Sequence, residues 1–253
     1  MTRIFITGST DGIGLATAKL LSSQGHTVTL HARNAQRASA TQKSIPDAKI
    51  LTGDLSSISE TKKLASEANK AGPFDTIIHN AGIGYGSTSS TQITDDGISA
   101  VFAVNTLAPY ILTCLMEKPK ERMLFMSSDS HYGGDGSLKN VTRSHSYGDS
   151  KLHDVMLANA LARRWQGVQV VSMHPGWVRT KMGGSMAPGG QDEPAKALAE
   201  WAVGEGSLAG LLSGTFFTTS GKQQTHRDAG DEGKQEELVR ICKEVSGVGV
   251  PGE

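Results

Sequence analysis

Short apolar runs alternate with longer amphipathic stretches along this chain. The apolar runs show little polar/apolar alternation, and most are followed by glycine, proline or polar residues. They span residues 3–7, 26–32, 49–52, 75–79, 122–126, 168–173 and 211–218. Runs of this length and composition are typical of strands that are buried on both faces of a parallel sheet. The pattern therefore predicts seven strands.

The stretches between these runs have apolar residues at helical spacing. They span residues 15–23, 35–44, 56–71, 94–116, 147–165, 194–203 and 234–245. Strands and helices that alternate, joined by right-handed crossovers, build a parallel sheet with helices on both faces. No internal repeat or composition shift marks a second domain. The sequence predicts an α/β fold, a single doubly wound Rossmann domain over residues 1–253 with a seven-stranded parallel sheet.

The stretch 94–116 contains two residues that disturb a regular helix. Its apolar stripe consists of Val101, Val104, Leu107, Ala108, Ile111 and Leu115. Asn105 is a poor helix former, and a buried polar group needs partners. We expect Asn105 to reorganise the local backbone or to hold a water, and Pro109 to bend the helix.

A glycine-rich turn separates the first strand from the first helix. It reads Gly8, Ser9, Thr10, Asp11, Gly12, Ile13 and Gly14. Glycines let the backbone approach a phosphate, and a helix N-terminus offers free N–H groups and a positive dipole end. The spacing G-x-x-x-G-x-G differs from the common dinucleotide fingerprint G-x-G-x-x-G. An ordinary glycine-rich turn is the alternative; we expect a dinucleotide-binding turn.

The end of the second strand decides which dinucleotide fits. NAD sites usually place a carboxylate there for the ribose 2′-hydroxyl. This chain has Arg33 and Asn34 instead. A guanidinium pairs with a phosphate in bidentate fashion, so Arg33 favours NADP(H) over NAD(H). The alternative is that Arg33 merely opens a solvated helix.

The ends of later strands carry further candidate cofactor residues. In a doubly wound sheet the ligand crevice lies at the carboxyl ends of the strands. The residues at or just beyond these ends are Asp54, Leu55, Asn80, Ala81, Gly82, Ser128, Pro175, Gly176, Val178 and Thr180. Asp54 either faces the adenine amine or caps the helix that follows, and the sequence leaves both open.

Tyr147 and Lys151 form a candidate acid–base pair. Four residues apart on a helix, they lie on one face, one turn from each other. A fixed ammonium beside a phenol favours the phenolate, so a Tyr–Lys pair is suited to donate a proton to a substrate oxygen. The spacing alone is weak evidence, because most such pairs are ordinary helix surface.

The composition excludes several functional classes. Lys+Arg and Asp+Glu are 25 each, so the zero net charge favours neither nucleic acid nor a membrane surface. We expect no membrane anchor, since no apolar run reaches about 18 residues. The eight histidines form no His-Glu-x-x-His motif, so we expect no metal. No G-x-S-x-G occurs either, so the sequence has no nucleophile elbow of a serine hydrolase. Cys114 and Cys242 are interpreted as buried thiols of a cytoplasmic protein.

These motifs together resemble the short-chain dehydrogenase/reductase family, over about residues 3–180. The matches are Thr7-Gly8-x-x-x-Gly12-Ile13-Gly14, Asp54-Leu55, Asn80-Ala81-Gly82, Asn105, Ser127-Ser128, Tyr147-x-x-x-Lys151 and Pro175-Gly176. Ser127-Ser128-x-x-His131 is similar to the retinol-dehydrogenase and carbonyl-reductase side of the family. The resemblance implies an oxidoreductase that moves a hydride between nicotinamide and a carbonyl or alcohol, and Arg33 makes NADP(H) the expected cofactor.

The resemblance also implies roles for four residues. Tyr147 donates the proton to the carbonyl oxygen. Lys151 favours its phenolate and hydrogen-bonds the nicotinamide ribose. Ser128 polarises the carbonyl, and Asn105 holds a water that links Lys151 to solvent. Together with Ser128, the expected walls of the substrate pocket are Tyr85, His131, Tyr132, Trp177, Met182 and Met186, under a lid of about residues 177–194.

Three further points stay open in the sequence. The favoured substrate is an apolar aldehyde or ketone; a non-catalytic NADP(H)-sensing regulator and an epimerase or dehydratase are the alternatives. Residues 133–146 look like an insertion that can alter the family's usual contact between subunits, so a homodimer, a homotetramer and a monomer all stay open. Asp11 stands where some NADP-preferring members carry a basic residue, so the NADP(H) prediction rests on Arg33 alone.

Overall fold

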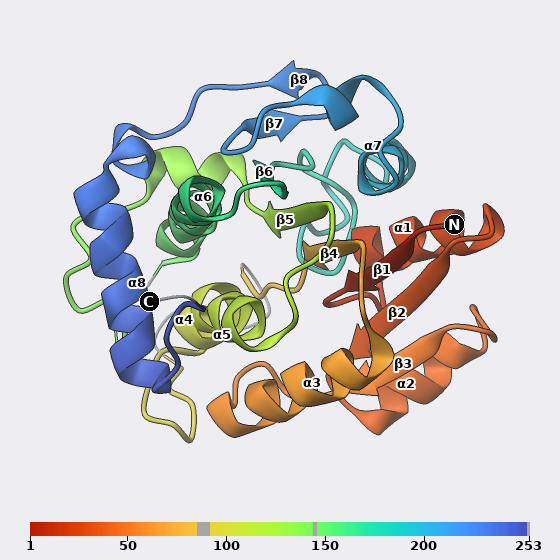
Figure 1. The fold of residues 1–253 in the computed structure, drawn as a ribbon, viewed down its shortest axis with the longest axis horizontal. Coiled ribbons are helices and arrows are strands. Elements are labelled where there is room, and N and C mark those ends of the chain that lie inside the picture. The colour runs from red at the N-terminus through yellow and green to blue at the C-terminus, as the bar shows by residue number, and fades with distance from the viewer. Residues whose placement is uncertain (85–91, 144–145, 252–253) are drawn as a thin grey trace.

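Eight strands form one sheet at the centre of the molecule (Figure 1). The structure is a computed structural model that describes residues 1–84, 92–143 and 146–251. The strand order is β3-β2-β1-β4-β5-β6-β7-β8. The strands are β1 (Arg3–Ile6), β2 (Thr27–Ala32), β3 (Lys49–Thr52), β4 (Thr76–His79), β5 (Arg122–Met126), β6 (Gln169–Met173), β7 (Phe216–Thr218) and β8 (Gly221–Lys222). β1 to β7 are parallel, which confirms the predicted doubly wound α/β fold.

The last two strands differ from the prediction. β8 pairs antiparallel with β7 and adds an eighth strand at the edge of the sheet. It is two residues long, so no apolar run marks it in the sequence. β7 takes up only the end of the predicted run 211–218, because the chain turns at Gly214 with a positive φ of 82°.

Helices cover both faces of the sheet. They are α1 (Gly12–Ser23), α2 (Ala35–Gln42), α3 (Ile58–Ala71), α4 (Ala100–Phe102), α5 (Ala108–Leu115), α6 (Tyr147–Arg164), α7 (Asp192–Ala202) and α8 (Glu232–Ser246). α1 and α7 pack together on one face, where Leu21 and Trp201 are fully buried. α3, α5 and α6 cover the other face, and α8 packs against α6 (Figure 1).

The predicted long helix 94–116 is broken into three parts. Its first residues form a turn closed by a bridge between Ile93 and Ser99, and α4 begins only at Ala100. A π-helical turn, Ala103–Leu107, then separates α4 from α5. Asn105 lies at the centre of this turn, so the predicted reorganisation of the backbone is confirmed. Pro109 stands in the first turn of α5, where its missing N–H costs nothing.

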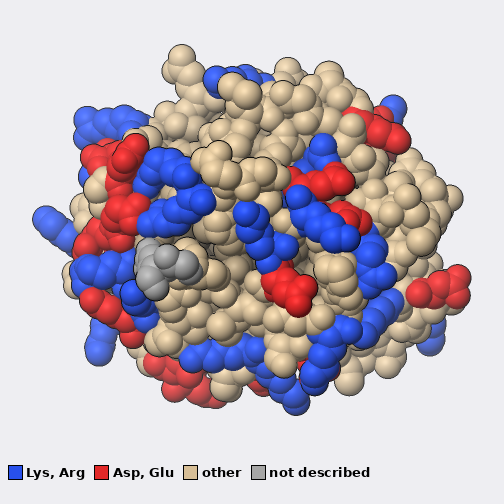
Figure 2. All heavy atoms as spheres, viewed as in Figure 1, with Lys and Arg blue, Asp and Glu red and all other residues tan. Residues whose placement is uncertain are grey.

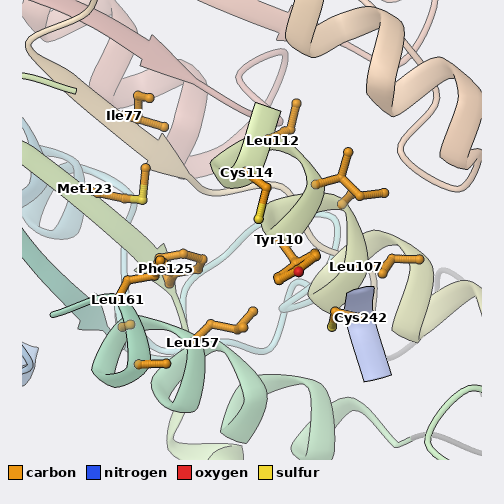
Figure 3. Packing of buried hydrophobic residues seen from close by; sticks show 14 of the residues in the cluster. Ile77, Leu107, Tyr110, Leu112, Cys114, Met123, Phe125, Leu157, Leu161 and Cys242 are labelled. Atoms are coloured by element: carbon orange, nitrogen blue, oxygen red, sulfur yellow. The ribbon is translucent and has the colours of Figure 1, made fainter. Parts of the chain in front are cut away.

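One hydrophobic core joins β5, α5, α6 and α8 (Figure 3). Figure 3 shows Tyr110 and Cys114 of α5 facing Leu157 of α6, with Cys242 of α8 close by. Both cysteines are buried, as predicted, neither forms a disulfide, and burial raises the pKa of Cys242. A thiol that stays protonated and shielded from solvent is a packing group. Within the described part of the chain, no helix is both long and apolar enough to cross a bilayer.

The predicted insertion packs against the rest of the protein. In its described part, residues 133–143, the side chains of Leu138 and Val141 belong to the main core. The N–H of Asp135 donates to Asp149 Oδ1 in the first turn of α6 at 2.8 Å. This segment therefore buttresses the start of the helix that carries Tyr147. Elsewhere on the surface, acidic and basic side chains lie interspersed on the face that Figure 2 shows.

Candidate active site

The glycine turn after β1 is held against the end of β4. A Cβ on Gly8 would lie 2.7 Å from Ala81 Cα, and one on Gly14 would clash with the Asn80 amide. The Asn80 amide in turn donates to the carbonyls of Thr7 at 2.9 Å and Gly8 at 3.1 Å. Only glycine allows this close approach, so Gly8, Gly14, Asn80 and Ala81 form one unit.

The turn presents an uncapped helix end. Asp11 is the N-cap of α1, yet its side chain makes no capping bond to the helix. The first N–H groups of α1 therefore stay available to an anion. Asp11 Oδ2 instead pairs with Arg37 at 3.1 Å and Lys181 at 3.2 Å. The two cations offset the negative charge that Asp11 places near an expected phosphate.

The other residues predicted in the turn face the protein. Ser9 is fully buried; its hydroxyl donates to the Ile6 carbonyl at 2.8 Å and accepts from the His31 N–H at 2.9 Å. Thr10 accepts a hydrogen bond from Arg37 at 3.3 Å. Ile13 packs on the core between the sheet and α1. These contacts shape the turn.

His31 in β2 joins three strand ends, a role that the sequence did not predict. Its Nδ1 accepts from the Gly8 N–H at 3.1 Å, so Nε2 carries the proton and donates to the Gly53 carbonyl at 2.8 Å. Burial lowers the pKa of His31, although the Gly53 carbonyl and Asp54 act against it. A neutral imidazole thereby fixes the glycine turn relative to the end of β3.

Arg33 and Asp54 lie together in a cavity of about 540 Å³. The cavity is lined by Arg33, Asn34, Ala35, Thr52, Gly53, Asp54, Glu60 and Lys63. Arg33 Nε donates to Asp54 Oδ2 at 2.9 Å. Asn34 Oδ1 accepts from the Arg37 N–H and so caps α2. Leu55 is buried in the core, which leaves its backbone, not its side chain, near the cavity.

Asp54 does not cap α3. Ser57 is the N-cap of that helix and accepts from the Glu60 N–H. Partial burial favours the neutral carboxyl, but hydrogen bonds from Ser56 and from Arg33 outweigh it and lower the pKa of Asp54. Asp54 is thus an ionised wall of the cavity, at the position expected for adenine recognition.

Tyr147 and Lys151 start α6 and point to the ends of β4 and β5. Ser146 caps this helix in a capping box with Asp149, which fixes the first turn. The Tyr147 ring lies against Gly84, since a Cβ there would be 2.8 Å from its Cδ2. Lys151 Nζ is 5.6 Å from the centre of the Tyr147 ring and donates to the Met126 carbonyl at 2.7 Å.

Asn105 ties the loop after β4 to α6. Its Oδ1 accepts from the Ile83 N–H, and its Nδ2 donates to the Ile83 carbonyl, both at 2.8 Å. Nδ2 also donates to the Ser150 hydroxyl at 2.9 Å, and that hydroxyl donates to the Tyr147 carbonyl. The side chain lies 3.4 Å from the site of a Cβ on Gly82. Asn105 therefore positions both the floor of the site and the first turn of α6.

Ser128 follows the end of β5 by two residues and caps the short helical turn Asp129–Gly133. Its hydroxyl accepts from the Ser130 N–H at 3.2 Å and donates to Asp129 Oδ1 at 3.0 Å. His131 Nδ1 donates to the Ser128 carbonyl at 2.6 Å, because a carbonyl oxygen only accepts. The preceding residue, Ser127, donates to the Lys151 carbonyl at 2.7 Å and so braces α6 against the strand.

His131 lies beneath the site rather than on its wall. The ring is fully buried between Tyr132 and Phe216. Burial lowers the pKa of His131, and the nearby His226 and His174 lower it further. The hydrogen bond to the Ser128 carbonyl raises this pKa but does not outweigh burial. The neutral ring contributes to the site through the backbone of Ser128.

Four predicted pocket residues are partly or largely exposed to solvent. Trp177 is 59% exposed and Met186 85% exposed, Tyr132 is half exposed, and Met182 is partly buried. The Tyr132 hydroxyl donates to the Gln224 carbonyl, and Trp177 Nε1 donates to the Gly183 carbonyl. Tyr85, also predicted for the pocket, lies outside the described residues.

The segment before α7 forms an ordered loop. After Pro175, Gly176 turns the chain with a positive φ of 90°. The buried Val178 then bridges to Gly189. Arg179, which the sequence did not predict, donates to the carbonyls of Ala187 at 3.0 Å and Pro188 at 2.7 Å. The Thr180 methyl lies 3.3 Å from the position of a Cβ on Gly12, which brings this loop over the glycine turn.

The described residues fit a nicotinamide dinucleotide. The uncapped start of α1 and the cradle without Cβ atoms suit its pyrophosphate. The cavity with Arg33 and Asp54 suits the adenosine. The surface formed by Gly82, Gly84 and the Tyr147 ring suits the nicotinamide ribose. The described chain has no cluster of metal-ligating side chains.

Known proteins are similar in sequence to this chain. Residues 2–189 match the short chain dehydrogenase family. An uncharacterized oxidoreductase of Emericella nidulans is 72% identical and covers 100% of both chains. Short-chain dehydrogenase chyC of Penicillium rubens is 41% identical over 99% of this chain and 100% of its own.

A solved structure agrees with these sequence relatives. The NADPH-bound carbonyl reductase from chicken fatty liver superposes with a TM-score of 0.69 and 25% identity. The match covers 89% of this chain and 99% of that protein. The family match exceeds half of the chain, and the relatives match it from end to end. The chain therefore belongs to the short-chain dehydrogenase/reductase family and is an oxidoreductase.

Proposed function

We propose that this protein is an NADP(H)-dependent reductase of apolar aldehydes or ketones. The observation that carries the proposal is the attachment of α6, which carries Tyr147 and Lys151, to the end of β5 that leads into Ser128. Ser127 donates to the Lys151 carbonyl, and Lys151 Nζ donates to the Met126 carbonyl, both at 2.7 Å. Asn105 of the π-helical turn joins the same helix through the Ser150 hydroxyl at 2.9 Å.

Four features support NADP(H) as the cofactor. Arg33 uses only Nε for Asp54 among the described residues, so both Nη groups can bind a 2′-phosphate bidentately. Lys63 lines the same cavity. Arg37 and Lys181 offset the charge of Asp11. The similar chicken carbonyl reductase binds NADPH.

The protein's own residues supply the proton chemistry. When bound, the nicotinamide supplies the hydride. Tyr147 donates a proton to the carbonyl oxygen, and the nearby Lys151 ammonium stabilises the phenolate that remains. The Ser128 hydroxyl, whose proton points to Asp129 in the free site, rotates towards the substrate carbonyl and polarises it. Asn105 keeps the loop after β4 and the first turn of α6 in register through its bonds to Ile83 and Ser150. The water that links Lys151 to solvent is proposed to bind at Asn105.

The open side of the site supports an apolar substrate. Trp177, Met182 and Met186 stand on the loop before α7, and we propose that this loop, within about residues 177–194, closes as a lid over the carbonyl compound. Exposed aromatic and methionine side chains gain from covering an apolar ligand. Closure also excludes water from the proton transfer.

Cofactor consumption by the purified protein tests the proposal. NADPH and NADH are offered separately with a panel of aromatic and aliphatic aldehydes and ketones. The proposal predicts NADPH turnover with at least one apolar carbonyl and much slower turnover with NADH. Tight NADPH binding without turnover on any of them would contradict it and would favour a sensor of NADP(H).

A further inference from the structure

α6 carries a third ionisable residue on the same face as Tyr147 and Lys151. Asp154 follows Lys151 by three positions and Tyr147 by seven, spacings that place the three side chains along one side of a helix. Its carboxylate accepts a hydrogen bond from Lys151 Nζ at 2.8 Å. The side chains of Lys151 and Asp154 are only 4% and 3% exposed, so the ion pair is buried.

Two hydrogen bonds fix the position of the Lys151 ammonium. Nζ donates to Asp154 Oδ2 on one side and to the Met126 carbonyl, at the end of β5, on another. It also lies 3.5 Å from the position that a Cβ on Gly82 would occupy. The ammonium is therefore held between the end of β5 and Gly82, beside which the nicotinamide ribose is expected.

Burial makes a counter-ion necessary for a charged lysine. An ammonium in the protein interior tends to lose its proton unless a negative group compensates it. Burial lowers the pKa of Lys151, but Asp154 and Tyr147 outweigh it, and the pKa ends above its ordinary value. Burial raises the pKa of Asp154 to about 6 against the attraction of Lys151. At pH 8 the carboxylate is therefore ionised.

The other ionisable groups around the site point elsewhere. His153, next to Asp154, faces Thr106 at 3.3 Å. His131 is bound to the Ser128 carbonyl, and His174 lies 3.8 Å from Asp129. From β5, the Met126 carbonyl accepts a hydrogen bond from Lys151 Nζ. Asp154 is thus the carboxylate that compensates Lys151 in the described structure.

We propose that Asp154 is a positioning residue for catalysis, whose carboxylate keeps Lys151 charged and holds the ammonium against the end of β5. The role of Lys151 in catalysis rests on the proposed function; the ion pair itself does not. Without Asp154, Lys151 loses its proton at lower pH and no longer stabilises the phenolate of Tyr147. Activity then fails on the alkaline side.

The pH profile of turnover tests the catalytic part. Asp154→Asn keeps the shape of the side chain and removes its charge. With saturating NADPH, the alkaline midpoint of kcat is expected to fall by at least about one pH unit. Asp75→Asn is the matched control, because Asp75 pairs with Lys120 and binds the Arg3 N–H at the opposite ends of the strands. The control should lose stability and keep its pH profile; a profile that also stays unchanged in Asp154→Asn would overturn the proposal.

A double-mutant cycle at pH 8 tests the ion pair without substrate or cofactor. Asp154→Asn and Lys151→Met each leave one buried charge unpaired, whereas the double variant leaves none. The double variant should therefore be more stable in urea than the sum of the two single changes in unfolding free energy predicts. Additive changes would overturn the pairing. If Asp154→Asn does not fold, Lys151→Met/Asp154→Leu must give a folded protein, and its failure would count against the proposal. Because the cycle needs no turnover, an inactive wild-type protein would refute the proposed function and leave this test standing.

Discussion

Replacement of Arg33 by alanine should weaken NADPH selectively. The guanidinium is 67% exposed and is anchored at Nε by Asp54, so it is pre-oriented without being buried. Its two Nη groups can each donate a charge-assisted hydrogen bond to a 2′-phosphate, worth about 1.5–3 kcal/mol apiece in favourable sites. Solvent screening at an exposed site reduces the sum, and about 2 kcal/mol is a reasonable total.

That energy corresponds to about a 30-fold rise in the Kd for NADPH. The Kd for NADH should change little, since NADH has no 2′-phosphate. The variant also leaves Asp54 without its ion pair, and the bare carboxylate repels the phosphate further. Arg33→Asp, which adds a second carboxylate beside Asp54, should move the preference towards NADH more strongly.

Fluorescence titration of both cofactors against wild-type and variant protein measures the effect. Lys43→Ala is the matched control, because Lys43 is an exposed cation after α2 that does not line the cavity. Its ratio of NADPH to NADH affinity should equal that of the wild type. The reasoning is refuted if Arg33→Ala shows the same ratio as well.

Three further predictions follow from the contacts around α6. Burial raises the pKa of Asp154 to about 6, so ionisation of this carboxyl lowers the stability of the folded protein as pH rises from about 4 to 6. Urea titrations across this window should show the unfolding free energy of the wild type falling relative to that of Asp154→Asn, by up to about 3 kcal/mol. Gly84→Ala places a methyl 2.8 Å from the Tyr147 ring and should lower kcat at least tenfold while NADPH binding persists. α8 covers α6 through ion pairs of Glu236 with Arg163 and Arg164, so light scattering should find a monomer; a stable dimer would show that another face associates.

The strand ends could be predicted because parallel strands deliver their carboxyl ends to one edge of the sheet. The glycine turn, Asp54, Asn80, Ser128 and the Tyr147 helix therefore met as expected. Arg33 and Asp54, 21 residues apart, share a cavity for the same reason. Two short features could not be predicted: β8, and the π-helical form of the backbone rearrangement that was expected at Asn105. A two-residue strand has no pattern, and the extra turn depends on bonds from Asn105 to Ile83, 22 residues away.

Burial explains why other site residues could not be predicted. His31 reads as one more residue of an apolar strand, and its bonds to Gly8 and Gly53 appear only once three strands pair. Asp154 has suitable helical spacing to Lys151, but a charged residue on a helix is normally exposed. Whether a group lies inside depends on what α8 and the sheet cover, and that is tertiary information.

The most direct test of the central claim is NADPH consumption by Tyr147→Phe beside the wild type. The variant keeps the ring against Gly84 and removes only the hydroxyl. Its kcat should fall by about 10²–10⁴-fold, while the Kd for NADPH stays within a few-fold of wild type. Tyr110→Phe, which loses a bond to the Val248 carbonyl far from the site, should keep its rate. Near-normal turnover by Tyr147→Phe would contradict its role as proton donor.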